Sequence, residues 1–495
     1  MSDAYQQLKE RQMVLHHLGN GARVLGWDME VMMPPKAAAE RGETMATLSA
    51  LMHEKATEPA IAELISQAEE LDLPEMDKRN LGMIRENYLL ASHIPEKLVY
   101  ALEEATDKTV TIWKDAKPKN DWQAVLPALQ ELFSLIREQA QIKAEILNRT
   151  IYDAQLYGSA RGNSQAVIDP LFAMLKENLP PLVQEITEKQ RGEGGNDKKI
   201  RLSVGAQKKI ARRLVQKLGY RFTSGRLDVA AHPFSSSSRE DGRITTRYSK
   251  ETPFTSLYGA MHETGHALYT KKLPLEWEGQ PIGGESDMSL HESQSLIMEK
   301  QAGLSDGFIH YLHGLVVQQD AEFSIRTSTE EMKRNLRQIK PGFIRVDADE
   351  ATYPLHVVLR YEMEKKLFSG EITVADIPQV WNDGFKELLG LEVKEHRLGC
   401  MQDIHWFWGL FGYFPTYTQG ALYAAQLYAA MKRDMPDIED DLGMGKFKRF
   451  NRWLNDNIHR HGQAFDAPEL IARATGENPD ARFFLQHLRK RYLQE

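Results

Sequence analysis

The chain has 495 residues, 42% of them hydrophobic, which is ample for a large buried core. Its single cysteine, Cys400, excludes an intramolecular disulfide framework, and 62 basic against 70 acidic residues, a net charge of −8, argue against a nucleic-acid partner. The N-terminus lacks the apolar core of a signal peptide, and no stretch approaches the ~20 apolar residues of a membrane span. We therefore expect a cytoplasmic protein with no membrane partner.

Most of the chain shows the apolar periodicity of amphipathic helices. Apolar residues recur at helical spacing on a polar background in three early segments: Ile61, Leu64, Ile65 and Ala68; Leu98 and Leu102; and Leu129, Leu132, Phe133, Ile136 and Ala140. The glycine-rich segment 191–197 predicts an exposed loop, and the best strand candidates are residues 242–248 and 342–346. There is no internal repeat. The helical periodicity predicts a mainly α protein.

Residues 262–266 have the sequence HETGH, in a helix that we expect to begin near Pro253. Residues four apart lie on the same helix face, so His262 and His266 can bind one Zn²⁺. Glu263 lies slightly off that face, where it can accept a proton from the attacking water. This segment therefore predicts two metal ligands and a general base.

A zinc site with two histidines needs a third ligand, and residues 289–295 begin a second helical segment shortly downstream. Glu292 is our predicted third ligand. In the alternative interpretation, Ser289 and Glu292 form a capping box at the start of that helix. His291 and Glu299 are rival ligands, and Glu299 is also placed to support a ligand from behind.

Five segments together resemble the carboxypeptidase Taq family of metallopeptidases. They are DGRIT at 241–245, HETGH at 262–266, HESQS at 291–295, IRVDAD at 344–349 and GCMQDIHW at 399–406. The first, fourth and fifth resemble the family patterns D-x-R-x-T, I-R-x-x-A-D and G-x-x-Q-D-x-H-W. The segment WDME at 27–30 is also similar to the family's opening, so the resemblance covers nearly the whole chain.

The resemblance implies an architecture and a metal. We expect residues 1–495 to form a single large helical body with a deep substrate cleft and a small antiparallel β-sheet beside the active site. An edge strand of that sheet would pair with an extended peptide through main-chain hydrogen bonds, which favours broad specificity. The family likeness also implies one Zn²⁺ per chain, with Co²⁺ or Mn²⁺ as alternatives, and a homodimer.

Further site residues follow from the family motifs. Tyr417 is our candidate for stabilising the oxyanion, with His405 and Tyr413 as alternates, although an aromatic segment of this kind also suits a packed core. Arg345 is the first candidate for binding the substrate's terminal carboxylate and Arg243 the second, because guanidinium binds carboxylate through two parallel hydrogen bonds.

Two more substrate-binding candidates, Asp241 and Gln402, lie in the same motifs. The plain alternative for the arginines is structural: Asp241 would pair with Arg243, and Asp347 or Asp349 with Arg345.

The expected function is hydrolysis of the C-terminal peptide bond of peptides that have a free C-terminus. An endo-oligopeptidase or peptidyl-dipeptidase with the same zinc chemistry is the alternative enzyme, and an inactive peptide-binding or scaffold protein is the alternative outside catalysis. Blocking the substrate's C-terminus distinguishes the two enzymes. Retention of Glu263 with the proposed ligands speaks against the inactive protein.

Overall fold

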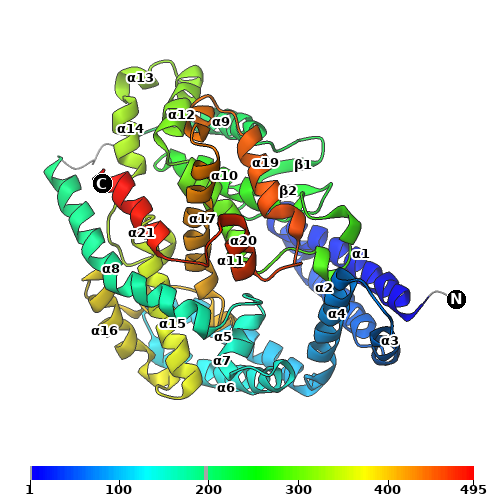
Figure 1. Cartoon of the computed structure of the whole chain (residues 1–495). Coiled ribbons are helices and arrows are strands. Elements are labelled where there is room, and N and C mark those ends of the chain that lie inside the picture. The colour runs from blue at the N-terminus through cyan, green and yellow to red at the C-terminus, as the bar shows by residue number, and fades with distance from the viewer. Residues whose placement is uncertain (1–2, 194–198, 495) are drawn as a thin grey trace.

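The computed structural model describes residues 3–193 and 199–494, most of which are folded into helices (Figure 1). The α-helices, in chain order, are α1 (Ala4–Val31), α2 (Ala38–Ala56), α3 (Ala60–Glu69), α4 (Glu75–His93), α5 (Glu96–Lys119), α6 (Trp122–Leu147), α7 (Ile151–Tyr157), α8 (Gln165–Gly192), α9 (Val204–Lys217), α10 (Pro253–Thr270), α11 (Met288–Leu296), α12 (Asp306–Gln319), α13 (Phe323–Arg326), α14 (Thr329–Leu336), α15 (Tyr353–Ser369), α16 (Ile377–Leu389), α17 (Phe414–Asp434), α18 (Ile438–Gly443), α19 (Lys448–Asn457), α20 (Ala467–Thr475) and α21 (Arg482–Leu488). The mainly α prediction is confirmed. Of the loop expected at 191–197, the first residues belong to α8 and residues 194–197 lie outside the described residues.

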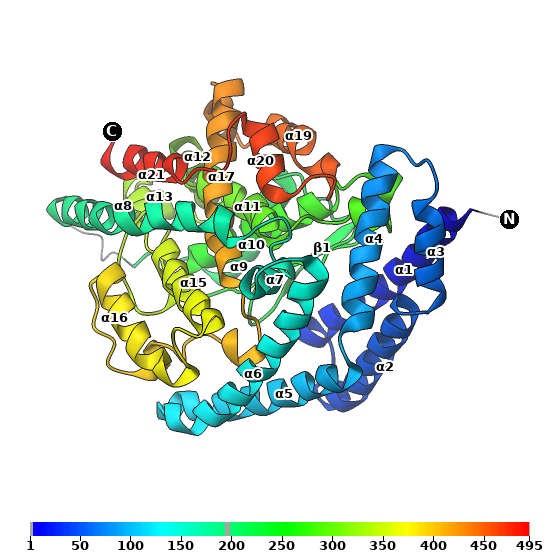
Figure 2. The ribbon, with the colours of Figure 1, turned by 60° about the horizontal axis from the view of Figure 1, so that its bottom comes forward.

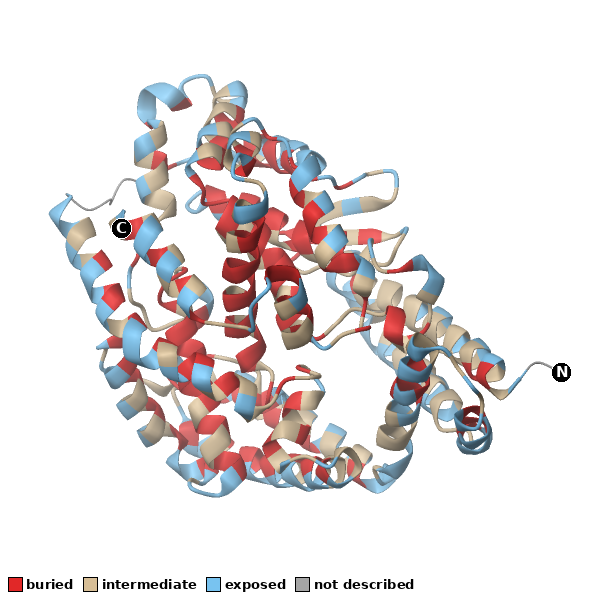
Figure 3. Cartoon of the chain, viewed as in Figure 1, coloured by how far each residue is buried: buried red, intermediate tan, exposed pale blue. Residues whose placement is uncertain are grey.

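Helix α17 runs through the centre of the molecule and is buried around most of its circumference (Figure 3). Phe414 and Leu422 pack into a core with α5, α6, α8, α15 and α16, whereas Tyr423 and Leu427 pack into a second core with α9, α10 and α12. A helix that is apolar on all sides is stable only when other elements cover every side. The shared helix therefore joins the two large cores.

The N-terminal helices α1–α4 lie along one side of the molecule, opposite α15 and α16 (Figure 2). Helices α1, α3 and α4 have a small core of their own, which includes Leu8, Ile61 and Ile84. Trp27 of α1 packs against the guanidinium groups of Arg226 and Arg243, which lie 4.5 and 4.4 Å from its ring centre. These contacts attach α1 to the sheet.

The sheet has two strands, β1 (Gly225–Val229) and β2 (Gly242–Thr246), and they are parallel, so the antiparallel sheet that we expected is wrong. The physical reason is the segment that connects them. This segment turns back and pairs with the far edge of β2 in an antiparallel bridge, Ser235 with Ile244. Strand β1 therefore pairs with the other edge of β2, and along that edge the two strands run in the same direction.

The predicted strand at 242–248 is present as β2, but residues 342–346 form no strand. A short 3₁₀ turn, Arg345–Asp347, stands there instead. The Gln402 side chain takes the place of a neighbouring strand: its Oε1 accepts from the Arg345 backbone N–H at 2.8 Å, and its Nε2 donates to the Phe343 carbonyl at 2.9 Å. The backbone groups are thereby satisfied without a sheet.

No helix in the described part of the chain combines the length and apolar character that crossing a membrane requires. A cavity of about 970 Å³ lies between the N-terminal helices and the segment that leads into α11. Its lining includes His16 of α1, Asn87 of α4, and Glu285. Glu285 contacts His291 at 3.2 Å, so this hollow reaches the surroundings of the predicted metal ligands.

Candidate metal centre

Two glycines let three helices approach closely at the predicted metal site. A Cβ on Gly265 of α10 would lie 2.3 Å from the Gln294 carbonyl oxygen of α11, and a Cβ on Gly420 of α17 would lie 2.7 Å from Glu292. Any larger residue would push the helices apart, because such distances are below van der Waals contact. Gly265 and Gly420 therefore place Glu292 beside His262 and His266.

The side chains of His262, His266 and Glu292 converge, and one ligand atom from each lies within 4.8 Å of the others. The Glu292 Oε2 atom is 3.6 Å from His262 Nε2 and 3.3 Å from His266 Nε2. Two atoms bound at about 2.1 Å to one tetrahedral ion lie roughly 3.4 Å apart. The donor set and its spacing therefore fit a zinc-type ion.

Glu299 and His291 lie behind the two histidines. The Glu299 carboxylate accepts from His262 Nδ1 at 2.9 Å, and His291 Nδ1 is hydrogen-bonded to His266 Nδ1. Each contact occupies the Nδ1 atom and leaves Nε2 to face Glu292. A second group that holds a ligating histidine in this way fixes its ring orientation. The two rival ligands, Glu299 and His291, thus contact the Nδ1 atoms of His262 and His266.

The capping-box alternative for Glu292 is wrong. Asp287 is the N-cap of α11, and its side chain accepts from the Leu290 backbone N–H at 3.0 Å. Ser289 therefore lies inside the helix, and Glu292 is one turn further along, free to face the histidines.

Carboxylates dominate the electrostatics of this cluster. Burial alone would lower the pKa of His262, but the charges of Glu292, Glu299 and Glu263 raise it to about 10. Burial, with a contribution from Glu292, raises the pKa of the Glu263 carboxyl to about 7, and this side chain is only 6% exposed. A site that stabilises added positive charge in this way is suited to a cation.

Arg345 belongs to a second, cationic cluster. Its Nε and Nη2 donate to Asp403 Oδ1 at 3.1 and 2.9 Å, and its Nη1 donates to the Tyr353 hydroxyl at 2.5 Å. Arg360 donates to the other oxygen of Asp403 at 2.9 and 2.6 Å. Two guanidinium groups thus share one carboxylate, which leaves one buried positive charge uncompensated. Of the five N–H donors of Arg345, these bonds use three.

Arg345 therefore pairs with Asp403 and not, as the structural alternative held, with Asp347 or Asp349. The Asp349 carboxylate instead accepts backbone N–H groups from Lys340, at 2.8 Å, and Thr352, at 2.9 Å.

Tyr417 and His405 lie between the two clusters. His405 Nε2 is 3.2 Å from the Tyr417 hydroxyl, and the Arg345 guanidinium lies 5.1 Å from the Tyr417 ring centre. Burial raises the pKa of Tyr417 well above its usual value, with smaller contributions from its tyrosine neighbours and from Glu292. Burial, together with the charge of Glu292, raises the pKa of Tyr413 to about 12. Burial and the charge of Arg345 lower the pKa of His405 to about 4. The phenols are therefore protonated donors and the imidazole is neutral at pH 7.

Arg243 lies on β2 and Asp241 directly precedes that strand, and the two pair with each other at 3.0 Å, as the structural alternative for Arg243 predicted. Asp241 also pairs with Arg23 of α1 at 3.3 Å. Within the described residues, neither forms a hydrogen bond or ion pair with the metal cluster. The structure thus places them with α1, whereas Gln402 bonds to the backbone around Arg345.

Sequence patterns did not single out three neighbours of the site: Asp403, Arg360 and Lys300. Asp403 stands inside the segment GCMQDIHW and could have been recognised there. Lys300, which follows Glu299 in the sequence and pairs with it at 2.7 Å, lies in no recognised motif, and Arg360 meets Asp403 only through the packing of distant segments.

The same features recur in known proteins. Residues 7–492 match the family described as carboxypeptidase Taq (M32) metallopeptidase. Thermostable carboxypeptidase 1 of Thermus thermophilus is 36% identical over 99% of this chain and 98% of its own length. Carboxypeptidase 1 of Bacillus subtilis is 33% identical over 97% of this chain and 96% of its own length.

Solved structures agree. Metallocarboxypeptidase 1 of Trypanosoma cruzi superposes with a TM-score of 0.95 at 36% identity, over 99% of both chains. A Pyrococcus furiosus carboxypeptidase superposes with a TM-score of 0.94 at 31% identity, also over 99% of both chains. The family predicted from the motifs is thus confirmed, and the chain belongs to the carboxypeptidase Taq (M32) family as an enzyme of the metallocarboxypeptidase class.

Proposed function

We propose that this enzyme removes single residues from the C-terminus of peptides with broad specificity, using one Zn²⁺ per chain held by His262, His266 and Glu292. The observation that carries the proposal is the uncompensated buried charge of the Arg345–Asp403–Arg360 cluster. This cluster lies beside Tyr417, whose pKa is affected both by the charge of Arg345 and by that of Glu292. A fixed positive charge near the reacting bond favours substrates that end in a carboxylate.

The residues around the ion have separate roles. When bound, the ion supplies Lewis-acid activation of the attacking water and the scissile carbonyl. Glu263 accepts the proton of that water and passes it to the leaving amine nitrogen. The Tyr417 hydroxyl donates to the oxyanion, with His405 Nε2 orienting it at 3.2 Å and Tyr413 as the alternate donor.

Arg345 has two N–H donors outside its bonds to Asp403 and Tyr353, and these bind the terminal carboxylate. We assign Gln402 the role of holding the Arg345 backbone in place through its hydrogen bond at 2.8 Å. We assign Arg243 and Asp241 to the substrate path on the side of α1, where Asp241 pairs with Arg23 at 3.3 Å.

The cavity of about 970 Å³ beside α1 and α4 supports a deep substrate cleft. A peptide held there through its main chain would be selected with little regard to side chains, which accounts for broad specificity. The endo-oligopeptidase alternative gains no support from an uncompensated guanidinium charge, because an internal peptide segment has no carboxylate at that position.

Mass spectrometry of an unblocked peptide and its amidated twin tests the proposal. The free peptide should give a ladder that loses one C-terminal residue per step, and the amide should resist. Glu263→Gln enzyme and chelated enzyme serve as controls, and both should leave the free peptide intact. Equal cleavage of the two peptides at internal bonds would assign the endo-oligopeptidase activity, and release of residue pairs the peptidyl-dipeptidase activity.

We also propose that residues 1–495 form one catalytic domain, which the shared helix α17 supports, and that the enzyme is a cytoplasmic homodimer, which rests on the family likeness. Metal analysis of the purified protein distinguishes Zn²⁺ from Co²⁺ and Mn²⁺. Light scattering of the same sample measures the number of chains in the particle.

A further inference from the structure

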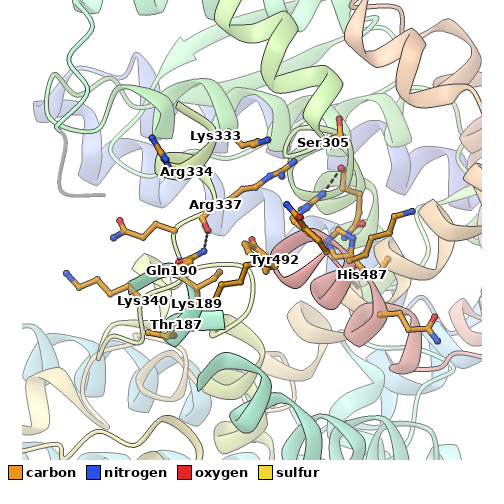
Figure 4. A pocket seen from close by; sticks show the side chains of 18 of the residues that line it. Thr187, Lys189, Gln190, Ser305, Lys333, Arg334, Arg337, Lys340, His487 and Tyr492 are labelled. Atoms are coloured by element: carbon orange, nitrogen blue, oxygen red, sulfur yellow. Dashed lines mark hydrogen bonds between the residues drawn. The ribbon is translucent and has the colours of Figure 1, made fainter. Parts of the chain in front are cut away.

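A second cavity, of about 940 Å³, is lined by none of the predicted metal ligands. It is bounded by the C-terminal ends of α8, α14 and α17 and by the π-helical turn Arg489–Leu493 that follows α21. Figure 4 shows Lys333, Arg334 and Arg337 along one side, with Lys189 and Lys340 on the opposite side. Its volume lies in the range of about 300–1,000 Å³ that is usual for small-molecule sites.

The lining of this cavity is strongly basic. It includes nine Lys or Arg residues and three Asp or Glu residues, although the whole chain carries a net charge of −8. The exposed cations Arg191, Arg334, Lys340 and Lys490 form no ion pair within the described part of the chain. Concentrated positive charge without internal partners attracts an anionic ligand.

The buried cation of the cavity wall, Arg491, is already paired, which leaves the exposed cations of the rim for a ligand. The Arg491 Nη1 donates to both oxygens of Glu350, at 3.0 and 2.9 Å, and the Tyr492 hydroxyl donates to the same carboxylate at 2.9 Å. His487 Nε2 lies 2.9 Å from Glu350 Oε1. The buried Glu350 carboxylate is thus already paired with Arg491, Tyr492 and His487, and it does not neutralise the exposed cations of the rim.

Like charges also crowd one another here. Burial lowers the pKa of Lys432, the neighbouring charge of Glu439 opposes this shift, and the charges of Lys490 and Arg491 add to it. On the same wall, the Oε1 atom of Gln301 is buried and has no hydrogen-bond partner among the described residues, although this side chain is only 2% exposed. An unpaired buried acceptor in a cavity is suited to a ligand that brings a donor.

We propose that this cavity binds a small molecule with a polyphosphate group. Its cations stand on opposite sides, so one small anion cannot meet them all, whereas a chain of phosphates carries several separated charges. Arginine and lysine are the side chains that bind phosphate oxygens best, and arginine does so through two parallel hydrogen bonds.

Calorimetric titration of the metal-loaded enzyme with inorganic tripolyphosphate and, separately, with adenosine triphosphate tests this site. Wild-type enzyme should bind at least one probe with one site per chain. Arg334→Ala combined with Lys340→Ala should weaken that binding at least 10-fold, and both residues are exposed, so the fold should persist. Tighter binding of adenosine triphosphate assigns a nucleotide, and tighter binding of tripolyphosphate an inorganic chain.

The matched control is Lys209→Ala combined with Lys217→Ala on the exposed face of α9, which removes the same charge elsewhere. This control should bind the probe within 2-fold of wild type. Equal losses in the two double variants would reduce the effect to general electrostatics and overturn the proposal. Binding that the Arg334 and Lys340 changes leave intact would place the probe on the metal ion and overturn it too, as would a triaspartate peptide that binds more tightly than both phosphates.

Discussion

Replacing Arg345 by alanine tests whether the buried charge beside the metal cluster selects for a terminal carboxylate. Arg345 and Asp403 are 5% and 12% exposed, so solvent screens their interactions only weakly. Asp403 keeps both hydrogen bonds from Arg360, at 2.9 and 2.6 Å, and is not left as an unpaired charge. The cluster would therefore fall from one positive charge to none without exposing a buried anion.

The expected cost on free peptides is about 2 to 5 kcal/mol in kcat/KM, the range for removing one member of a buried charge pair. This corresponds to a loss of roughly 30-fold to several-thousand-fold. Residual cleavage of the amidated peptide should change little, because the amide carries no charge for Arg345 to bind. The ratio of kcat/KM for free and amidated peptides is thus the quantity to measure.

Arg360→Met is the matched control. It removes the same charge from the cluster, but Arg360 is 0% exposed and cannot touch substrate, so the ratio should fall less than in Arg345→Ala. Metal content and the thermal midpoint of both variants exclude damage to the fold. A folded, metal-loaded Arg345→Ala enzyme that keeps the wild-type ratio would refute the assignment and make Arg243 the next residue to test.

Glu263→Gln should retain bound metal and lower kcat at least ~100-fold, because the ligands stay and only the base is lost; an active variant would contradict the mechanism. Glu292→Ala should abolish tight metal binding, whereas Glu299→Ala, which frees His262 Nδ1, should weaken it by about 10- to 100-fold; equal losses on metal titration would reopen the ligand assignment. Burial lowers the pKa of His459 to about 3. Between pH ~6.5 and this value, the unfolded chain binds a proton at His459 and the folded protein does not. Stability should therefore fall as the pH drops from ~6.5 towards 3, and His459→Gln should reduce that slope by about 1.4 kcal/mol per pH unit in denaturant titrations; an unchanged slope would rule His459 out.

Local sequence was sufficient wherever the determining distances are short. The spacing of His262 and His266 places both imidazoles on one helix face, because helical periodicity is a property of neighbouring residues. The same holds for Glu263 and for the mainly helical composition of the chain. Five short motifs, read together, are also enough to identify the family.

Tertiary structure alone decided which distant groups meet. Asp403 is 58 residues from Arg345 and 43 from Arg360, and no pattern in either segment predicts that the three converge. Strand β1 pairs in parallel because the connecting segment already pairs with the other edge of β2. Residues 342–346 form no strand because the Gln402 side chain, from another segment, pairs with their backbone. Such choices depend on which buried polar groups find partners in the packed molecule, and periodicity along the chain contains no information about that.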